Sequence, residues 1–340
     1  MTAEVPAPIQ VAGAPALAGP TNAAPARRPG SVRRTSSLDL VPAPDGSLAV
    51  RGVARDLHTG TDGSARVTGS GLLRLTVDAE RTVATLSAHP HGPALAALRG
   101  RSVAAGFRTA VWRALPAEYD AGSPLLLLLD DVSGGMVISG FTRRKVVVQG
   151  SLPPVTRRID VCVGWAAESD AVRRLEEEGR PPPPQWNPVA PRRYAADPAG
   201  RHTAPALPPN GMRRARRLDV WFDESGDLAA DVGFRDTFVD PDGIERVLHE
   251  YSARLSARDG RVATIEATAH VLPHLECPLG ALSAQRVVGR PLAALRDSVS
   301  LDFFGPSTCT HLNDLLRGLS DLPALAQPLG DPSSNPPAAR

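Results

Sequence analysis

The sequence predicts an α+β fold with two related lobes, each a small antiparallel sheet packed against two or three helices. Short apolar runs joined by turn residues indicate β-hairpins early in the chain. The same pattern of residues returns in the second half of the chain. Near the C-terminus, leucines recur at helical spacing. These observations predict strands followed by covering helices, twice along the chain.

The composition is typical of a soluble cytoplasmic protein. The chain has 340 residues, 42% of them hydrophobic, and a net charge of +2 at pH 7. Two cores can therefore form, and no strong attraction to nucleic acid or to an anionic membrane is expected. Its 3 cysteines are widely spaced, which is typical of a reducing cytosol and not of a disulfide framework. Lys145 is the single lysine among many arginines, which indicates a GC-rich, bacterial genome.

Neither a membrane span nor a signal peptide is predicted. No apolar stretch approaches the ~18 residues that a membrane helix requires, and the N-terminal residues lack the apolar run of a signal peptide. We therefore expect a cytoplasmic protein whose partner is an unknown protein or small molecule, with no nucleic acid and no membrane.

Composition divides the chain into five segments. Residues 1–30 are rich in alanine and proline and are predicted to be a disordered tail. Residues 31–150 form the first, diverged copy of the lobe, and residues 211–322 form the second. Residues 151–210 are a Pro-rich connector, and residues 323–340 are a second disordered tail.

The first copy begins with predicted hairpins and continues with a helical pattern. Strands are expected on both sides of the turn Pro44-Asp45-Gly46-Ser47. A second hairpin is expected from Gly71 to Leu86, and a helical pattern from Pro93 to Val111. An apolar run at Leu125 to Val132 precedes two predicted strands, Met136 to Ile138 and Lys145 to Val148.

The connector has little predicted structure of its own. It holds one strand-like run, Ile159 to Val163, and one charged helix candidate, Asp170 to Glu178, before the prolines Pro181 to Pro184. Trp165 and Trp186 are expected to hold the connector against a domain surface.

The second copy repeats the first at a constant spacing of 180, without a gap. The spacing predicts an internal duplication. The matches pair Arg33-Arg34, Leu38-Asp39, Gly46, Leu48-Ala49 and Arg55-Asp56 with Arg213-Arg214, Leu218-Asp219, Gly226, Leu228-Ala229 and Arg235-Asp236.

A helix carrying reactive side chains is predicted near the end of the second copy. Pro306 is followed by Ser307 and Thr308, which are N-cap residues, so the helix should begin at about Cys309. The helix N-terminus favours a thiolate at Cys309, and His311 could act as a base or a ligand. If both residues are helical, their side chains point ~200° apart, so they converge only if Cys309 precedes the first turn. The apolar stripe consists of Leu312, Leu315, Leu316 and Leu319.

The second copy resembles the bacterial family called domain of unknown function 2889. The resemblance covers about Arg213 to Leu319. It is carried by Arg213-Arg214, Phe222-Asp223-Glu224-Ser225-Gly226, Arg235-Asp236-Thr237, Val288-Gly289-Arg290 and Cys309-Thr310-His311-Leu312. The family has no established activity to transfer, so the resemblance supports the boundaries of the second copy. It also draws attention to Cys309 and His311, which occupy the family's Cys-Thr-His-Leu motif.

These residues suggest two kinds of site. His274, Cys277, Cys309 and His311 could form a closed metal site for zinc or iron. Alternatively, Cys309 is a catalytic nucleophile with His311, or with His270 or His274, as its base. The acidic run at Asp236, Asp240 and Asp242 is better explained as a solvated turn. The arginine run from Arg213 to Arg217 is better explained as a salt-bridged strand edge than as a nucleic-acid surface.

The sequence leaves three functions open. The first is a non-catalytic module that binds a ligand or partner, or serves in assembly, with a metal or thiol site in the second copy. The second is a thiol-dependent enzyme that uses Cys309. The third is a purely structural pseudo-dimer whose cysteines belong to the core.

Overall fold

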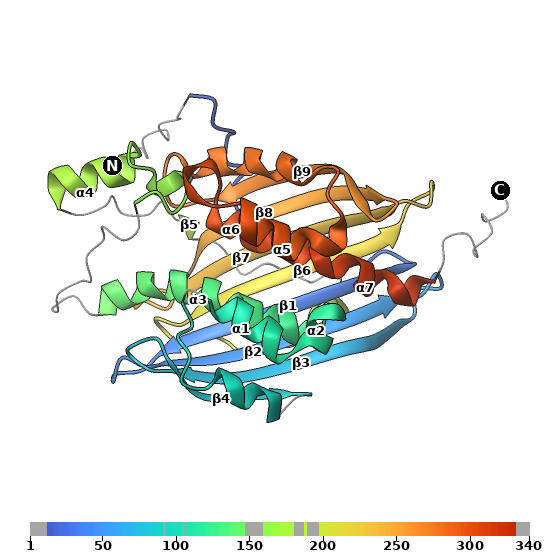
Figure 1. Cartoon of the computed structure of the whole chain (residues 1–340), viewed down its shortest axis with the longest axis horizontal. Helices are drawn as coiled ribbons and strands as arrows, with labels where there is room; N and C mark the ends of the chain where they lie inside the picture. The colour runs from blue at the N-terminus through green and yellow to red at the C-terminus, as the bar shows by residue number, and fades with distance from the viewer. Residues whose placement is uncertain are drawn as a thin grey trace.

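The structure, a computed structural model, describes residues 12–90, 93–104, 106–146, 159–179, 187–188 and 197–330. In these residues the strands form one nine-stranded sheet in the order β4-β3-β2-β1-β6-β7-β8-β5, with β9 also paired to β8 (Figure 1). All of its strand pairings are antiparallel. The strands are β1 (Ser31–Pro42), β2 (Leu48–Thr59), β3 (Ala65–Val77), β4 (Val83–His89), β5 (Asn187–Pro188), β6 (Met212–Phe222), β7 (Leu228–Val239), β8 (Glu245–Arg258) and β9 (Arg261–Val271).

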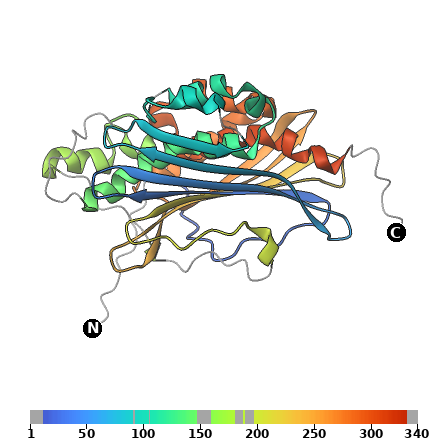
Figure 2. The same cartoon turned by 90° about the horizontal axis from the view of Figure 1, so that it is seen from below.

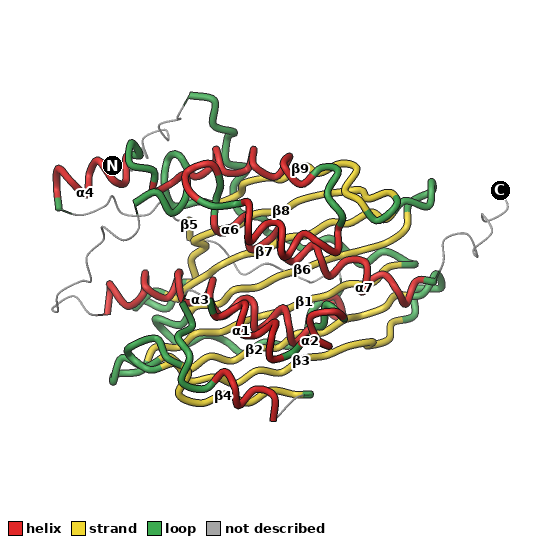
Figure 3. Tube along the Cα trace, in the orientation of Figure 1, coloured by secondary structure: helices red, strands yellow, loops and turns green. Residues whose placement is uncertain are grey.

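Most of the helices cover one face of this sheet (Figures 1 and 3). Among the described residues, no helix is both long enough and apolar enough to cross a membrane. The α-helices are α1 (Phe107–Ala114), α2 (Pro116–Asp120), α3 (Pro124–Val146), α4 (Asp170–Glu178), α5 (Leu295–Asp302), α6 (Thr310–Gly318) and α7 (Leu322–Ala326). The 3-10 helices are η1 (Pro93–Leu98), η3 (Val163–Trp165), η4 (Pro198–Gly200), η5 (Cys277–Val287), η6 (Leu292–Ala294), η7 (Gly305–Ser307), η8 (Leu319–Asp321) and η9 (Gln327–Leu329).

Apolar and polar side chains alternate along the strands, and this alternation determines which face of the sheet the helices cover. In β2, Leu48 and Val50 are buried while Ala49 and Arg51 are exposed, as expected for a strand with one apolar face. The apolar faces of β1 to β4 pack against α1 and α3, and those of β6 to β9 pack against η5 to α7. The opposite face is crossed by the irregular segments 12–30 and 197–211 (Figure 2).

The two halves of the sheet meet where β1 pairs with β6. Ser36 and Arg216 stand opposite each other in this pairing, and Arg216 follows Ser36 by the predicted spacing of 180. The pairing is therefore symmetric about this position. Arg33 pairs with Asp219 at 2.5 Å, and Arg213 pairs with Asp39 at 2.6 Å.

Strand registers recur in the two halves. The β1–β2 and β6–β7 pairings have equivalent registers at the spacing of 180, as do β2–β3 and β7–β8. Each half also has a β-bulge at the same position, after Asp56 in β2 and after Asp236 in β7. An extra residue at a fixed position sets the local twist of a sheet and is a specific feature of a fold.

One expectation about the architecture needs correction. The sequence suggested a separate small sheet in each lobe, whereas β1 and β6 join all the strands into one sheet. Each of these strands would otherwise leave a row of backbone N–H and C=O groups without partners at a sheet edge. The arginine run from Arg213 to Arg217 therefore lies in a central strand, and its side chains are salt-bridged as predicted.

The long apolar segment after Gly122 is a helix and not a pair of strands. Met136 to Ile138 and Lys145 to Val146 belong to α3, and the remaining residues of the second predicted strand lie outside the described part. A helix buried on most sides has no polar face, so its periodicity does not distinguish it from buried strands. Ile159 to Val163, also predicted to be a strand, forms a turn that leads into η3. Two predicted helices are confirmed, α4 at Asp170 and α6 after Cys309.

Parts of the predicted tails and connector contact the fold. In the segment 12–30, Thr21 hydrogen-bonds to Glu250, and Arg27 pairs with Asp197 at 2.8 Å. Residues 322–329 form α7 and η9 on the sheet. Their composition favoured disorder, but segment 12–30 gains specific polar partners, and α7 buries Leu322, Leu325 and Ala326. The predictions for residues 1–11, Pro181 to Pro184, Trp186 and residues 331–340 lie outside the described residues.

Candidate functional site

A layer of paired charges lies between the sheet and its helices. Arg34 binds both carboxylate oxygens of Asp56 at 2.7 Å, and Arg214 binds both oxygens of Asp236 at 2.8 and 2.9 Å. Burying such charges is costly unless each one is compensated, and here arginines and aspartates balance. The layer consists of Arg34, Arg108, Arg214, Arg216, Arg296 and Arg317 with Asp56, Asp130, Asp131, Asp236, Asp314 and Asp321.

Two histidines join this layer in the second half only. His249 of β8 stands directly opposite Asp236 of β7, and the corresponding residue of the first half is Gly69, opposite Asp56. His311, in the first turn of α6, stacks on His249 with 3.6 Å between ring centroids. One potential ligand atom from each of Asp236, His249 and His311 lies within 4.8 Å of the other two. No other cluster of this kind occurs in the part of the chain that the structure describes.

Local structure explains why these side chains converge. The register between β7 and β8 shifts by one residue at the bulge after Asp236. Asp236 and His249 are the last directly opposed pair before this shift. Cys309 has an extended conformation and is the N-cap of α6, which places His311 at the start of the helix, above β8. His311 is half-buried and is therefore the most accessible of the three.

The electrostatics of the cluster suit metal ligands. Burial alone would raise the pKa of Asp236, but Arg214 and His249 outweigh it and hold that pKa below the ordinary value. Burial, together with the neighbouring His249, lowers the pKa of His311 well below its ordinary value. At neutral pH the site therefore offers a carboxylate and a neutral imidazole, the forms that bind metals.

His249 also has an unsatisfied buried atom. Its Nδ1 lies 3.4 Å from Oδ2 of Asp236 but makes no directed hydrogen bond within the described residues. A buried polar atom without a partner in a native structure calls for an explanation such as an ion or a water molecule. The site thus has three potential ligand atoms close together, one of them without a directed hydrogen bond.

The cysteines lie elsewhere, in the core between η3, η5 and the start of α6. Cys162, Cys277 and Cys309 are all buried and free. Burial raises the pKa of Cys309, and it raises that of Cys277 well above the ordinary value. Burial also raises the pKa of Cys162 to about 12. All three are therefore neutral thiols at physiological pH, which makes them poor nucleophiles.

Packing leaves little room around these sulfurs. A Cβ atom added to Gly280 would lie 2.5 Å from Cβ of Cys309, and one added to Gly164 would overlap Sγ of Cys277. His274 packs edge-on against Trp165, with 5.4 Å between centroids. The structure thus places His311 with His249 and Asp236, and it places Cys277 and Cys309 in a tightly packed core.

The tight packing gives a testable prediction. We expect Gly280→Ala to lower the free energy of unfolding by about 2 kcal/mol, because overpacking forces neighbouring groups apart. Gly233→Ala is the matched control, since its added Cβ would meet ordinary contacts at 3.5 and 4.0 Å. Urea denaturation of both variants measures the difference. A Gly280→Ala protein as stable as the Gly233→Ala protein would show that space exists beside Cys309.

His249 is not among the candidate ligands expected from the sequence, and Asp236 is expected there in a solvated turn. The turn at Asp240-Pro241-Asp242-Gly243 offered a signal, because a hairpin closed there brings Asp236 opposite a residue near position 248 or 249. Strand register was therefore needed to recognise the pair.

The fold defines an α+β protein with one antiparallel sheet, covered by helices on one face and carrying a buried polar cluster in its second half. Residues 212–324 match a family described as "Protein of unknown function (DUF2889)", which confirms the resemblance of the C-terminal region. Comparisons with curated proteins and with solved structures gave no significant match.

Proposed function

We propose that this protein is a non-catalytic binding module that holds a divalent zinc or iron ion at Asp236, His249 and His311. The observation that carries the proposal is the mutual approach of three ligand atoms within 4.8 Å. Two imidazoles and one carboxylate form a ligand set used for both metals. Of the four metal ligands predicted from the sequence, this proposal keeps His311. Asp236 and His249 take the place of His274, Cys277 and Cys309.

The distances support a first-row metal. Two ligands at ~2.05 Å from a tetrahedral ion are about 3.4 Å apart, which matches the Nδ1–Oδ2 separation of His249 and Asp236 at 3.4 Å. Arg214 already donates two hydrogen bonds to the carboxylate of Asp236. A carboxylate has about four lone-pair positions, so Asp236 can accept these bonds and bind a metal ion at the same time. The guanidinium then acts as the outer partner that orients the ligand.

The other two functions are less well supported. A thiol-dependent enzyme needs a thiolate beside a base, whereas burial raises the pKa of Cys309 and His311 stacks on His249. A purely structural pseudo-dimer accounts for the buried cysteines. It does not account for the approach of three potential ligand atoms from Asp236, His249 and His311 in the second half.

We also propose that the two halves arose by duplication and then diverged. The repeated registers, the repeated bulge and the symmetric pairs Arg33–Asp219 and Arg213–Asp39 support this origin. On this proposal, residues 31–150 and 211–322 are the two copies, and Gly69 marks the copy without a metal site. A bacterial, cytoplasmic protein remains our expectation from the composition.

Metal analysis of the purified protein tests the proposed function. Protein isolated without chelators under anaerobic conditions should contain about one zinc or iron per chain, and His311→Ala should lose it. His270→Ala is the control, because His270 is hydrogen-bonded to Ser252 and to the carbonyl of Gly19. Cys309→Ser should keep the metal. Loss of metal in Cys309→Ser but not in His311→Ala would reject this site and favour the cysteines.

A further inference from the structure

The sheet face opposite the helices carries a row of side chains that places two arginines side by side. Asp39, Arg51, Arg74 and Ser87 stand directly opposite one another on β1, β2, β3 and β4. The row is thus acidic, basic, basic and neutral. Like charges directly opposite each other on neighbouring strands are destabilising, so this arrangement carries a cost in the free protein.

The corresponding row of the second half has its charges compensated. Asp219, Asp231, Arg254 and Glu266 stand opposite one another on β6 to β9. Arg254 lies between two acidic residues, and its Nε is 3.3 Å from Oδ2 of Asp231. Arg217 pairs with both Asp219 and Asp231. No additional anion is needed there.

The first half lacks this compensation. Arg51 occupies the position of Asp231, and Ser87 occupies that of Glu266. Asp39 gives both its oxygens to Arg213, at 2.6 and 2.8 Å. Within the described residues, the guanidinium groups of Arg51 and Arg74 have no ion pair and no hydrogen bond. Arg51 and Arg74 are exposed, whereas the paired arginines of the neighbouring strands β1 and β6 are buried or half-buried.

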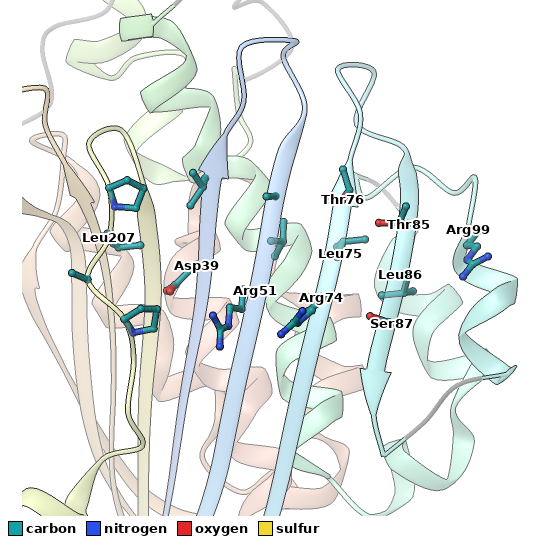
Figure 4. Close-up of a pocket in the computed structure, with 16 residues that line it drawn as sticks. Asp39, Arg51, Arg74, Leu75, Thr76, Thr85, Leu86, Ser87, Arg99 and Leu207 are labelled. Atoms are coloured by element: carbon teal, nitrogen blue, oxygen red, sulfur yellow. The ribbon is translucent and has the colours of Figure 1, made fainter.

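The two arginines lie in a groove of about 700 Å³. In Figure 4, Arg51 on β2 and Arg74 on β3 lie side by side along the groove, with Leu207 near one end and Arg99 near the other. Proline and leucine side chains of residues 205–208 form an apolar wall, and Thr76, Thr85 and Ser87 supply hydroxyl groups. This volume falls within the range of small-molecule sites.

We propose that this groove binds a small organic phosphate, with its phosphate group between Arg51 and Arg74 and its organic part against Leu207. A phosphomonoester carries about −1.5 to −2 charge at neutral pH and has three acceptor oxygens. It can therefore engage two guanidinium groups and a nearby hydroxyl, whereas a monocarboxylate compensates only one of the two charges. The site is independent of the metal cluster, which lies on the other face of the sheet.

Calorimetric titration of the full-length protein with phenyl phosphate tests this proposal. We expect one binding site, at least about tenfold weaker in Arg51→Asp, because that change restores the acidic residue of the second half and repels the anion. Arg254→Gln is the matched control at the position equivalent to Arg74, and it should bind as the wild type does. Benzoate should bind at least about tenfold more weakly than phenyl phosphate.

The Arg51→Asp variant also provides its own folding control. The carboxylate that this change introduces would pair with Arg74 as Asp231 pairs with Arg254, so the unfolding midpoint of the free variant should equal or exceed that of the wild type. Absence of phenyl phosphate binding, unchanged binding in Arg51→Asp, or equal losses in Arg51→Asp and Arg254→Gln would overturn the proposal. Equal binding of benzoate would overturn the assignment of a phosphate.

Discussion

Replacing Arg214 by methionine is expected to cost about 4 kcal/mol of folding free energy, as removal of one partner from a buried ion pair typically does. The Arg214 side chain is 0% exposed and pairs with Asp236 and Asp314 at 2.8 and 2.6 Å. Its loss leaves the buried carboxylate of Asp236 without its main cation and removes one of the cations around Asp314, which keeps Arg108 and Arg317. Methionine fills much of the volume of the arginine side chain. The loss of folding free energy is therefore due to the missing charge and not to a cavity. Guanidinium chloride denaturation measures it.

Arg258→Met is the control for this prediction. Arg258 also forms a double hydrogen bond with an aspartate, Asp227, but its side chain is 67% exposed. Exposed ion pairs contribute little to stability, so this variant should unfold like the wild type. Both measurements need a chelator, so that metal binding at Asp236 does not contribute. Equal stability of the Arg214→Met and Arg258→Met proteins would mean that the buried charge layer does not stabilise the fold.

His202 is expected to make the protein less stable as the pH falls from 6.5 toward 3. Its ring lies on the sheet face opposite the helices, hydrogen-bonded to Thr35 and Ser37 at 2.9 and 2.8 Å. Burial lowers the pKa of His202 to about 3, with further contributions from Arg201, Arg55 and Arg213. In the unfolded chain the ring takes up a proton near pH 6.5. Between these values the unfolded chain binds more protons, so stability decreases as the pH falls.

The measurement is the free energy of unfolding at a series of pH values between 6.5 and 4.5. In the wild type, the free energy of unfolding should decrease as the pH falls. His202→Gln should reduce this pH dependence by about 1.4 kcal/mol per pH unit. Ser37→Ala removes a hydrogen bond to the ring but keeps the titrating group, so it should lower stability by about 1 kcal/mol and keep the slope. An unchanged slope in His202→Gln would contradict a buried neutral His202.

The start of α6 shows what local sequence signals predict well. Pro306 and the following hydroxyl residues predicted a helix from about Cys309, and the structure begins α6 at Thr310 with Cys309 as its N-cap. The stripe of Leu312, Leu315, Leu316 and Leu319 is buried. The expected N-cap, Ser307 or Thr308, is wrong, because Cys309 holds that position without a side-chain cap hydrogen bond. The amphipathic spacing depends on neighbours along the chain, so a single sequence suffices to predict it.

Features that depend on strand neighbours could not be predicted in this way. The pairing of β1 with β6 joins residues far apart in the chain, and the metal cluster combines β7, β8 and α6. Cys309 and His311 drew attention because they are close together in the sequence. The fold directs Cys309 into the core and His311 toward His249. The partners of a reactive residue are thus set by register and packing, which the sequence alone does not give.

Anomalous diffraction from crystals of the protein, recorded at the zinc and iron absorption edges, tests the central claim most directly. We predict one peak within about 2.0–2.2 Å of a ring nitrogen of His249, a ring nitrogen of His311 and a carboxylate oxygen of Asp236. Crystals of His311→Ala should lack this peak. A peak beside Cys277 and Cys309, or no peak in metal-containing crystals at the Asp236–His249–His311 cluster, would contradict the proposed metal centre.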